Sequence, residues 1–457
     1  MSVAAANERQ AARTRSLLEA PVLPTLLRLA GPNILVMLAQ SATGLVETAF
    51  VGRLGTDALA GMSLVFPGVM LMQMNGAGAM GGGISSAIAR ALGAGRRDDA
   101  DALVMHALAI NGALGLAFTA AGLLAGPALY RLMGGHGPAL AAALQYSNVV
   151  FGGAVLMWIM NALASCIRGT GNMVVPAVVI CSLVVVLVPL SPMLIFGFGP
   201  LPRLGVQGGG VAMLLYYATA SAVFAAYLRS GRGVIRLRLT LRLRLRSLWD
   251  ILRVGLLAAL VSVQTQVVVS TATALVGRFG TAAIAGYGVG ARLEYLLIPL
   301  VFGLGAPLVA LVGTNIGARQ RARAIRVAWV GAAIGFAMTE AIGVLAALVP
   351  DAWLRLFAQD PAVLEAGRTY LRLVGPFYGF FGLGTAIYFA SQGAGRMAWP
   401  LVAALLRAAI AVVGGVAALH WTGRLGPVFL ALGAGLFALG TVNALALARG
   451  AWFEARA

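Results

Sequence analysis

Long apolar segments dominate the chain, and short clusters rich in arginine, glycine and proline separate them. The segments are long enough to cross a bilayer and are apolar on both faces. Because a bilayer admits only helices or closed barrels as spanning structures, helices are the economical interpretation. We therefore predict an all-α polytopic membrane protein with twelve transmembrane helices. They lie at about 29–50, 58–88, 102–126, 138–166, 174–197, 206–228, 252–276, 282–315, 325–350, 368–391, 399–420 and 427–448.

The two halves of the chain share a repeated pattern. Residues 51–61 recur as residues 276–286, with eight of eleven positions identical. Further matches, at a spacing of 224, pair Gly93 with Gly317, Tyr146 with Tyr370 and Gly169 with Gly393. Six helices per copy is an even number, so both copies have the same orientation in the membrane. The pattern predicts two parallel six-helix repeats with a cavity between them.

A basic linker joins the two predicted lobes. From Ile235 to Arg246, leucine or isoleucine alternates with arginine or threonine. This period of two favours an extended ribbon whose arginine edge follows an anionic cytoplasmic leaflet. A solvated linker that obeys the inside-positive rule is the alternative. The predicted boundaries are a cytoplasmic N-terminal segment (1–28), a first lobe (29–228), the linker (229–250), a second lobe (251–449) and a cytoplasmic tail (450–457).

Composition and charge agree with a membrane protein. Hydrophobic residues make up 60% of the chain and charged residues 10%, with a mean hydropathy of +0.91, which excludes a set of soluble domains. The net charge of +19 comes from arginines in the gaps between apolar segments, so it indicates topology rather than nucleic-acid binding. Alternate loops carry 23 arginines on one side and eight on the other. We expect both termini in the cytoplasm, and the chain in a bacterial inner membrane.

No catalytic constellation is present in the sequence. The chain has no HExxH, CxxC, GxSxG or Walker phosphate-loop motif, so we expect neither an enzyme nor a bound metal or cofactor. Cys166 and Cys181 fall within apolar segments and are expected to be free thiols.

Ionisable side chains within the apolar segments are the functional candidates, because charge is costly in hydrocarbon. Glu47 is the first: a carboxylate that is charged in one state and neutral in another can exchange a proton for a cationic substrate. A structural ion pair with Arg53 is the alternative. Glu294 and Glu340 lie near mid-membrane, with a transport role and an inter-helix ion pair both open, and Arg407 is the candidate counter-charge for one of them.

Uncharged polar groups suit a substrate cavity. The candidates, which offer adaptable hydrogen bonds, are Asn33, Gln40, Asn161, Gln264, Gln266 and Tyr378. Met70, Met72, Met74 and Met80 are either a deformable cavity wall or ordinary packing.

The repeated segment at 47–61, its copy, and the glycine-containing segments 93–95, 194–197 and 392–395 together resemble the multidrug and toxic compound extrusion (MATE) family. The resemblance extends over about residues 24–449. It implies secondary active efflux, in which a proton or sodium gradient drives the export of organic, often cationic, compounds by alternating access of two six-helix lobes. Glu47 occupies the place of the family's usual aspartate before Thr48, so the resemblance implies a coupling role for it.

Other acidic positions of the family are absent. Leu187 and Ser191 stand where bacterial relatives have an asparagine and an aspartate, and Thr265 stands where another branch has a glutamate. We therefore favour protons over sodium as the coupling ion. We expect a monomer in contact with membrane lipids and small-molecule substrates. A flippase for lipid-linked oligosaccharides is the alternative within the superfamily, and a passive channel is the alternative of another class.

Overall fold

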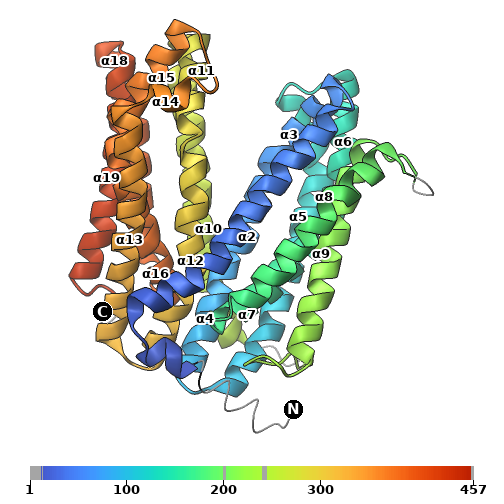
Figure 1. Ribbon diagram of the computed structural model, residues 1–457, viewed down its shortest axis with the longest axis vertical. Helices are drawn as coiled ribbons and strands as arrows, with labels where there is room; N and C mark the ends of the chain where they lie inside the picture. The colour runs from blue at the N-terminus through green and yellow to red at the C-terminus, as the bar shows by residue number, and fades with distance from the viewer. Residues whose placement is uncertain (1–11, 13, 199–201, 239–243, 454–457) are drawn as a thin grey trace.

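The computed structural model describes residues 12, 14–198, 202–238 and 244–453. Two helical bundles diverge from a shared end, so the molecule has the outline of a V (Figure 1). The first and last residues that the structure describes lie at the end where the bundles meet, which we call the closed end; the other is the open end.

The first bundle, the N-lobe, contains the elements of the first repeat. They are α2 (Val22–Gly52), α3 (Thr56–Gln73), the π-helix η1 (Met74–Met80), α4 (Gly81–Gly93), α5 (Arg97–Leu132), α6 (Gly137–Gly152), α7 (Ala154–Gly169), α8 (Val174–Phe196) and α9 (Val206–Arg229).

The second bundle, the C-lobe, contains the elements of the second repeat. They are α10 (Leu245–Gly277), α11 (Thr281–Ala291), α12 (Glu294–Gly317), α13 (Arg321–Leu348), α14 (Asp351–Leu354), α15 (Pro361–Val374), the 3₁₀-helix η2 (Gly375–Phe377), α16 (Tyr378–Ala394), α17 (Ala398–Ala409), the π-helix η3 (Ile410–Gly414), α18 (Gly415–Thr422) and α19 (Leu425–Ala448).

The described residues form eleven helical spans that are long and apolar enough to cross a membrane, and a bent pair makes the twelfth. The pair is α6 and α7, which meet at an angle of 44°. Gly152 and Gly153 stand at the bend, where the lack of side chains weakens the helix. The predicted all-helical fold of twelve spans is therefore confirmed.

Close glycine contacts repeat in both lobes. In the N-lobe, a Cβ atom at Gly61 of α3 would lie 2.7 Å from the backbone nitrogen of Ala143 on α6. In the C-lobe, a Cβ at Gly286 of α11 would lie 2.8 Å from the backbone nitrogen of Gly367 on α15. Equivalent helices of the two copies thus pack through equivalent glycines, as expected for parallel repeats.

The two lobes meet through glycines that the repeat also relates. A Cβ at Gly93 on α4 would collide with the carbonyl of Thr314 on α12, and a Cβ at Gly317 on α12 would collide with the carbonyl of Arg90 on α4. Because both contacts use backbone atoms, the ends of α4 and α12 touch with no side chain between them. This junction lies at the closed end.

Helix α2 does not belong wholly to the N-lobe. Leu26 and Ala30 are buried in a core cluster made mainly of C-lobe residues, and the Asn33 amide donates to the carbonyls of Phe302 (3.2 Å) and Gly303 (3.0 Å) on α12. From there α2 crosses to the N-lobe at the open end (Figure 1). The sequence placed the whole helix in the first lobe because it gives no sign of which partner each turn contacts.

The described part of the linker packs on α5 rather than extending as a free ribbon. Ile235 is buried in the N-lobe core, and the backbone N–H of Arg236 donates to Asp101 Oδ1 at 2.8 Å. Arg238 pairs with Asp98 at 3.4 Å and with the buried Asp101 at 3.3 Å. For the described residues of the linker, the interpretation of a ribbon on the lipid leaflet is corrected, because Arg238 and Arg244 pair with carboxylates of α5 instead. Residues 239–243 lie outside the described residues, and α10 already begins at Leu245.

Candidate functional site: a cavity between the lobes

A cavity of about 320 Å³ lies between the two lobes. Its N-lobe wall comes from α2, α3, η1, α4 and α6 to α9, and its C-lobe wall comes from α12 and α16. The lining extends from Glu47 and Met62, towards the open end, to Ser85 and Arg168, towards the closed end. Of the six predicted polar residues, Asn33, Gln40 and Asn161 line it.

Glu47 lies in the N-lobe wall of this cavity and is 5% exposed. The hydroxyl of Tyr146 on α6 donates a hydrogen bond to its Oε1 at 3.2 Å. Arg53, the predicted alternative partner, instead lies over the ring of Phe50, 6.0 Å from its centroid. Among the described residues no cation forms an ion pair with Glu47, and the neutral hydroxyl of Tyr146 is its hydrogen-bond partner.

A glycine makes room for the Glu47 side chain. A Cβ at Gly209 on α9 would lie 2.8 Å from Glu47 Oε1. The adjacent Gly208 lets α9 approach α8, because a Cβ there would lie 2.5 Å from the carbonyl oxygen of Leu194. The carboxylate therefore sits where α2, α6 and α9 converge, and small residues set that spacing.

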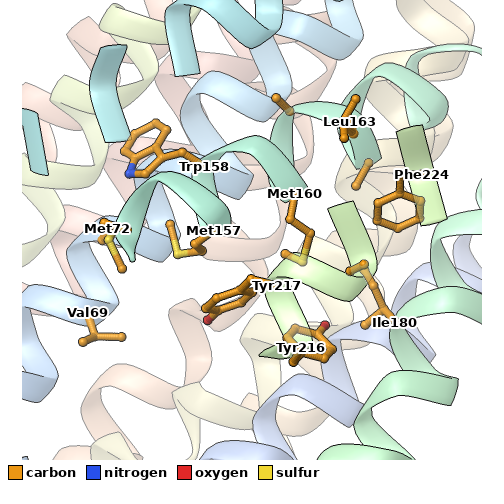
Figure 2. Packing of buried hydrophobic residues seen from close by; sticks show 14 of the residues in the cluster. Val69, Met72, Met157, Trp158, Met160, Leu163, Ile180, Tyr216, Tyr217 and Phe224 are labelled. Carbon is orange, nitrogen blue, oxygen red and sulfur yellow. The ribbon is translucent and has the colours of Figure 1, made fainter. Parts of the chain in front are cut away.

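The cavity wall is rich in flexible apolar side chains. Seven methionines line it: Met37, Met62, Met70, Met74, Met157, Met160 and Met213. Figure 2 shows Met157 and Met160 extending from α7 towards Tyr217 on α9, while Trp158 turns away. The amide of Gln73 donates to the Tyr217 hydroxyl at 3.4 Å. Of the methionines singled out from the sequence, Met72 and Met80 are buried packing residues instead. Unbranched thioethers adapt to ligands of different shape.

Two residues related by the repeat form the part of the lining nearest the closed end. Arg168 on α7 is buried and donates to Ser165 Oγ at 3.0 Å. Gln392 on α16 donates to the carbonyl of Gly78 at 3.2 Å and to the hydroxyl of Tyr388 at 3.2 Å. Among the described residues, the lining of the cavity thus contains one carboxylate, Glu47, and one guanidinium, Arg168, towards opposite ends.

Glu294 lies apart from the central cavity, in an aromatic cluster of the C-lobe. The hydroxyl of Tyr370 on α15 donates to Glu294 Oε1 at 2.5 Å, and the hydroxyls of Tyr378 and Tyr370 lie 3.5 Å apart. Tyr287 packs edge-on against Tyr370. Arg407 on α17, the predicted counter-charge, forms no ion pair with Glu294 or Glu340 among the described residues.

The remaining predicted residues are dispersed. Glu340 on α13 is partly buried and accepts the backbone N–H of Gly379 at 2.7 Å. Gln264 on α10 is buried and Gln266 is exposed, and neither lines the central cavity. Tyr378 joins the Glu294 cluster instead. The structure thus separates the predicted set into a central cavity and a C-lobe cluster.

Sequence reasoning did not assign a role to the tyrosines that hold the two glutamates. The repeat pairs Tyr146 with Tyr370, and in the structure each donates to a glutamate: Tyr146 to the buried Glu47 and Tyr370 to the partly buried Glu294. A signal was available, because a tyrosine preserved in both copies within apolar helices needs a partner for its hydroxyl. Among the described residues no group of three His, Cys, Asp or Glu side chains has the arrangement of a metal site.

Comparison with known proteins assigns the chain to one family. A family model described as MatE matches residues 32–193 and 258–417, which is most of each lobe. A protein of Deinococcus radiodurans described as a probable multidrug resistance protein NorM is 30% identical over 406 residues, covering 84% of this chain and 85% of the relative. A protein of Shewanella oneidensis described as a FAD transporter is 28% identical over 381 residues, covering 82% of each chain.

Solved structures agree with the sequence comparison. A MATE transporter in complex with MaD3S superposes with a TM-score of 0.87 at 25% identity, covering 96% of this chain and 98% of that one. An outward-facing multidrug resistance MATE transporter of the MOP superfamily gives a TM-score of 0.86 at 24% identity, with the same coverage. The chain therefore belongs to the MATE family of multidrug efflux transporters, which are multi-pass membrane transporters rather than enzymes.

Proposed function

We propose that the chain is a proton-coupled antiporter that exports organic cations and amphipathic compounds across a bacterial inner membrane, with Glu47 as the proton-binding group. The observation that carries this proposal is the position of Glu47. It is a buried carboxylate in the wall of the inter-lobe cavity, and it accepts a hydrogen bond from the neutral hydroxyl of Tyr146.

The chemistry follows from the cost of burying charge. A carboxylate without a cationic partner is expensive in a low-dielectric site, so binding either a proton or a cationic substrate relieves the same cost. The two ligands then compete for one group. Competition of this kind couples the movement of protons in one direction to the movement of substrate in the other.

The lining of the cavity supports a broad range of organic substrates. Seven methionines and the rings of Tyr216, Tyr217, Phe302 and Phe389 present a deformable apolar surface around a few polar groups. A volume of about 320 Å³ suits a small organic molecule. With the termini in the cytoplasm, as the arginine distribution indicates, the open end faces away from the cytoplasm, and the lobes rock about the contact between α4 and α12 during alternating access.

Glu294 is a second candidate for ion coupling. Its carboxylate is held by Tyr370, the counterpart of Tyr146 in the repeat, but it lies outside the central cavity. In this proposal it responds to the coupling ion without contacting substrate. Glu340 has a backbone partner on the same lobe and is assigned no more than a supporting role.

An anionic cargo is the second candidate function. Arg168 lies in the cavity lining, away from Glu47, and the relative from Shewanella oneidensis is described as a FAD transporter. A dinucleotide would place its phosphates beside Arg168. The same cation would suit the pyrophosphate of a lipid-linked sugar, so a flippase is the corresponding alternative function.

Transport by purified protein in liposomes distinguishes these functions. We expect a lipophilic cationic dye to move under an imposed pH gradient and not under a sodium gradient. Movement under the sodium gradient alone would contradict proton coupling. Transport of FAD or a lipid-linked sugar, with no dye movement, would favour the anionic cargo. Liposomes without protein provide the control for passive dye leakage.

A further inference from the structure

A second cavity, of about 630 Å³, lies at the closed end and is separate from the transport cavity. Five arginines line it: Arg90, Arg253, Arg319, Arg321 and Arg396. No carboxylate is among its lining residues in the described part of the chain. The other lining residues are Ile316, Ala394, Trp452 and Phe453, so the pocket is cationic with an apolar border.

In the described part of the chain, none of these five arginines forms an ion pair. A Cβ at Gly395 would lie 2.9 Å from Arg90 Nη1 and 3.5 Å from Arg253 Nη2, so both groups approach the same loop. Arg253 Nε is buried and has no hydrogen-bond partner among the described residues. Asp250 is the acid whose charge acts on Arg90. Like charges gathered in this way are unfavourable unless an anion joins them.

The second repeat acquires this charge at positions that are neutral in the first. Arg319 corresponds to Gly95, and Arg396 corresponds to Asn172, both at the spacing of 224. Arg319 adopts a φ of 60°, in the left-handed region where Gly95 has a φ of 73°. A glycine has no strain in that conformation, whereas an arginine does. The presence of an arginine at this strained position points to a function for its charge.

Several groups also prepare the pocket for a ligand. The guanidinium of Arg321 lies over the ring of Phe453, 5.0 Å from its centroid, which orients it without neutralising it. The Trp452 indole donates to Ser391 Oγ at 3.2 Å, which fixes the border. Arginine forks match the oxygens of a phosphate group in both geometry and charge.

We propose that this pocket binds a phosphate group at the closed end of the transporter. Arg90 belongs to the first repeat, and the other four arginines follow the linker and belong to the second lobe. A bound phosphate therefore joins the lobes beside the junction of Gly93 and Gly317. The phosphate comes either from the headgroup of an anionic lipid or from a soluble phosphate compound.

The test uses two substitutions that restore the residues of the first repeat. Arg319→Gly and Arg396→Asn are combined in the full-length chain, and neither residue contacts the transport cavity. Arg449→Asn is the matched control, because Arg449 is exposed after α19 and does not line the pocket. Thermal unfolding of purified protein is followed during titration with inorganic phosphate at constant ionic strength. A second titration uses phosphatidylglycerol, with phosphatidylcholine as the uncharged reference.

We expect the melting temperature of the wild type and of Arg449→Asn to rise with one or both phosphate sources. The double variant should bind at least about tenfold more weakly, because two charge-assisted contacts are lost. A response to phosphatidylglycerol alone identifies a lipid headgroup, and a response to both identifies a general phosphate site. The proposal is overturned if the wild type responds to neither, or if the double variant responds as the control does. Dye efflux by the double variant under a pH gradient is measured in parallel. This measurement distinguishes failure of the phosphate proposal from failure of the proposed transport function.

Discussion

Two tyrosines related by the repeat each donate a hydrogen bond to a glutamate, but the glutamates come from different helices. Tyr146 holds Glu47 from the first helix of its lobe, and Tyr370 holds Glu294 from α12. The position of Glu47 could be predicted from the sequence, because a carboxylate in an apolar segment stands out. Its tyrosine partner could not, because that contact depends on how α2, α6 and α9 pack.

Replacing Tyr146 with phenylalanine tests the role of its hydroxyl at the residue scale. The variant loses a hydrogen bond to an ionisable group, which contributes roughly 1.5–3 kcal/mol. We expect gradient-driven dye efflux to slow by about tenfold or more while the melting temperature stays within a few degrees. Tyr370→Phe is the matched control in the other lobe, and a smaller effect there is expected because Glu294 lies outside the cavity. Equal effects of the two variants would contradict the assignment of substrate coupling to the N-lobe.

At the scale of the helices, the hydrophobic pattern predicted the positions of the membrane spans well, but it did not predict the bends and breaks within them. The ends of most helices fall within a few residues of the predicted ones, because arginine, glycine and proline clusters mark them. The bend at Gly152–Gly153 and the break between α11 and α12 are invisible in the pattern, since both sides are equally apolar. The position of the linker could not be predicted for another reason. The residues that it contacts, at the start of α5, are distant from it in the sequence.

Gly286→Ala tests whether α11 and α15 pack through a glycine. The added methyl group would press on backbone atoms of α15, and overpacking of this kind costs about 1–3 kcal/mol. We expect a lower melting temperature in detergent. Gly288→Ala is the control two residues along the same helix, where an added Cβ meets no atom within 4 Å. There, loss of glycine flexibility should leave stability equal or higher, by up to about 1 kcal/mol. A stable Gly286→Ala variant would show that the contact is dispensable.

At the scale of the whole molecule, duplication in the sequence predicted two parallel lobes with a cavity between them. The repeat-related contacts of Gly61 and Gly286, and of Gly93 and Gly317, agree with that arrangement. Which conformation the structure adopts could not be predicted, because the same sequence must be compatible with every state of the transport cycle. The crossing of α2 from the C-lobe to the N-lobe was equally hidden, since each turn of that helix is apolar.

Gly93→Val tests the closed-end junction as the contact that holds this conformation. The larger side chain separates the ends of α4 and α12. The conformation seen here, in which the lobes diverge at the open end, therefore becomes less stable relative to the conformation in which they diverge at the other end. The reporter is Ser41→Cys, an exposed position in the cavity, in a background without Cys166 and Cys181. We expect slower labelling by an impermeant thiol reagent applied from the open end. Gly31→Val, where an added Cβ meets no atom within 4 Å, should label at the original rate. Unchanged labelling of Gly93→Val would rule out the junction as the pivot.

The central claim is that Glu47 couples protons to export, and Glu47→Gln tests it most directly. Glutamine keeps the size and the hydrogen-bonding capacity of the side chain but cannot exchange a proton. The measurement is cationic-dye movement into or out of proteoliposomes under an imposed pH gradient, beside wild type and Asp57→Asn, which changes the exposed acid at the start of α3. The account predicts that Glu47→Gln retains its melting temperature and loses gradient-driven transport, while Asp57→Asn transports as the wild type does. Transport by Glu47→Gln at the wild-type rate would contradict it.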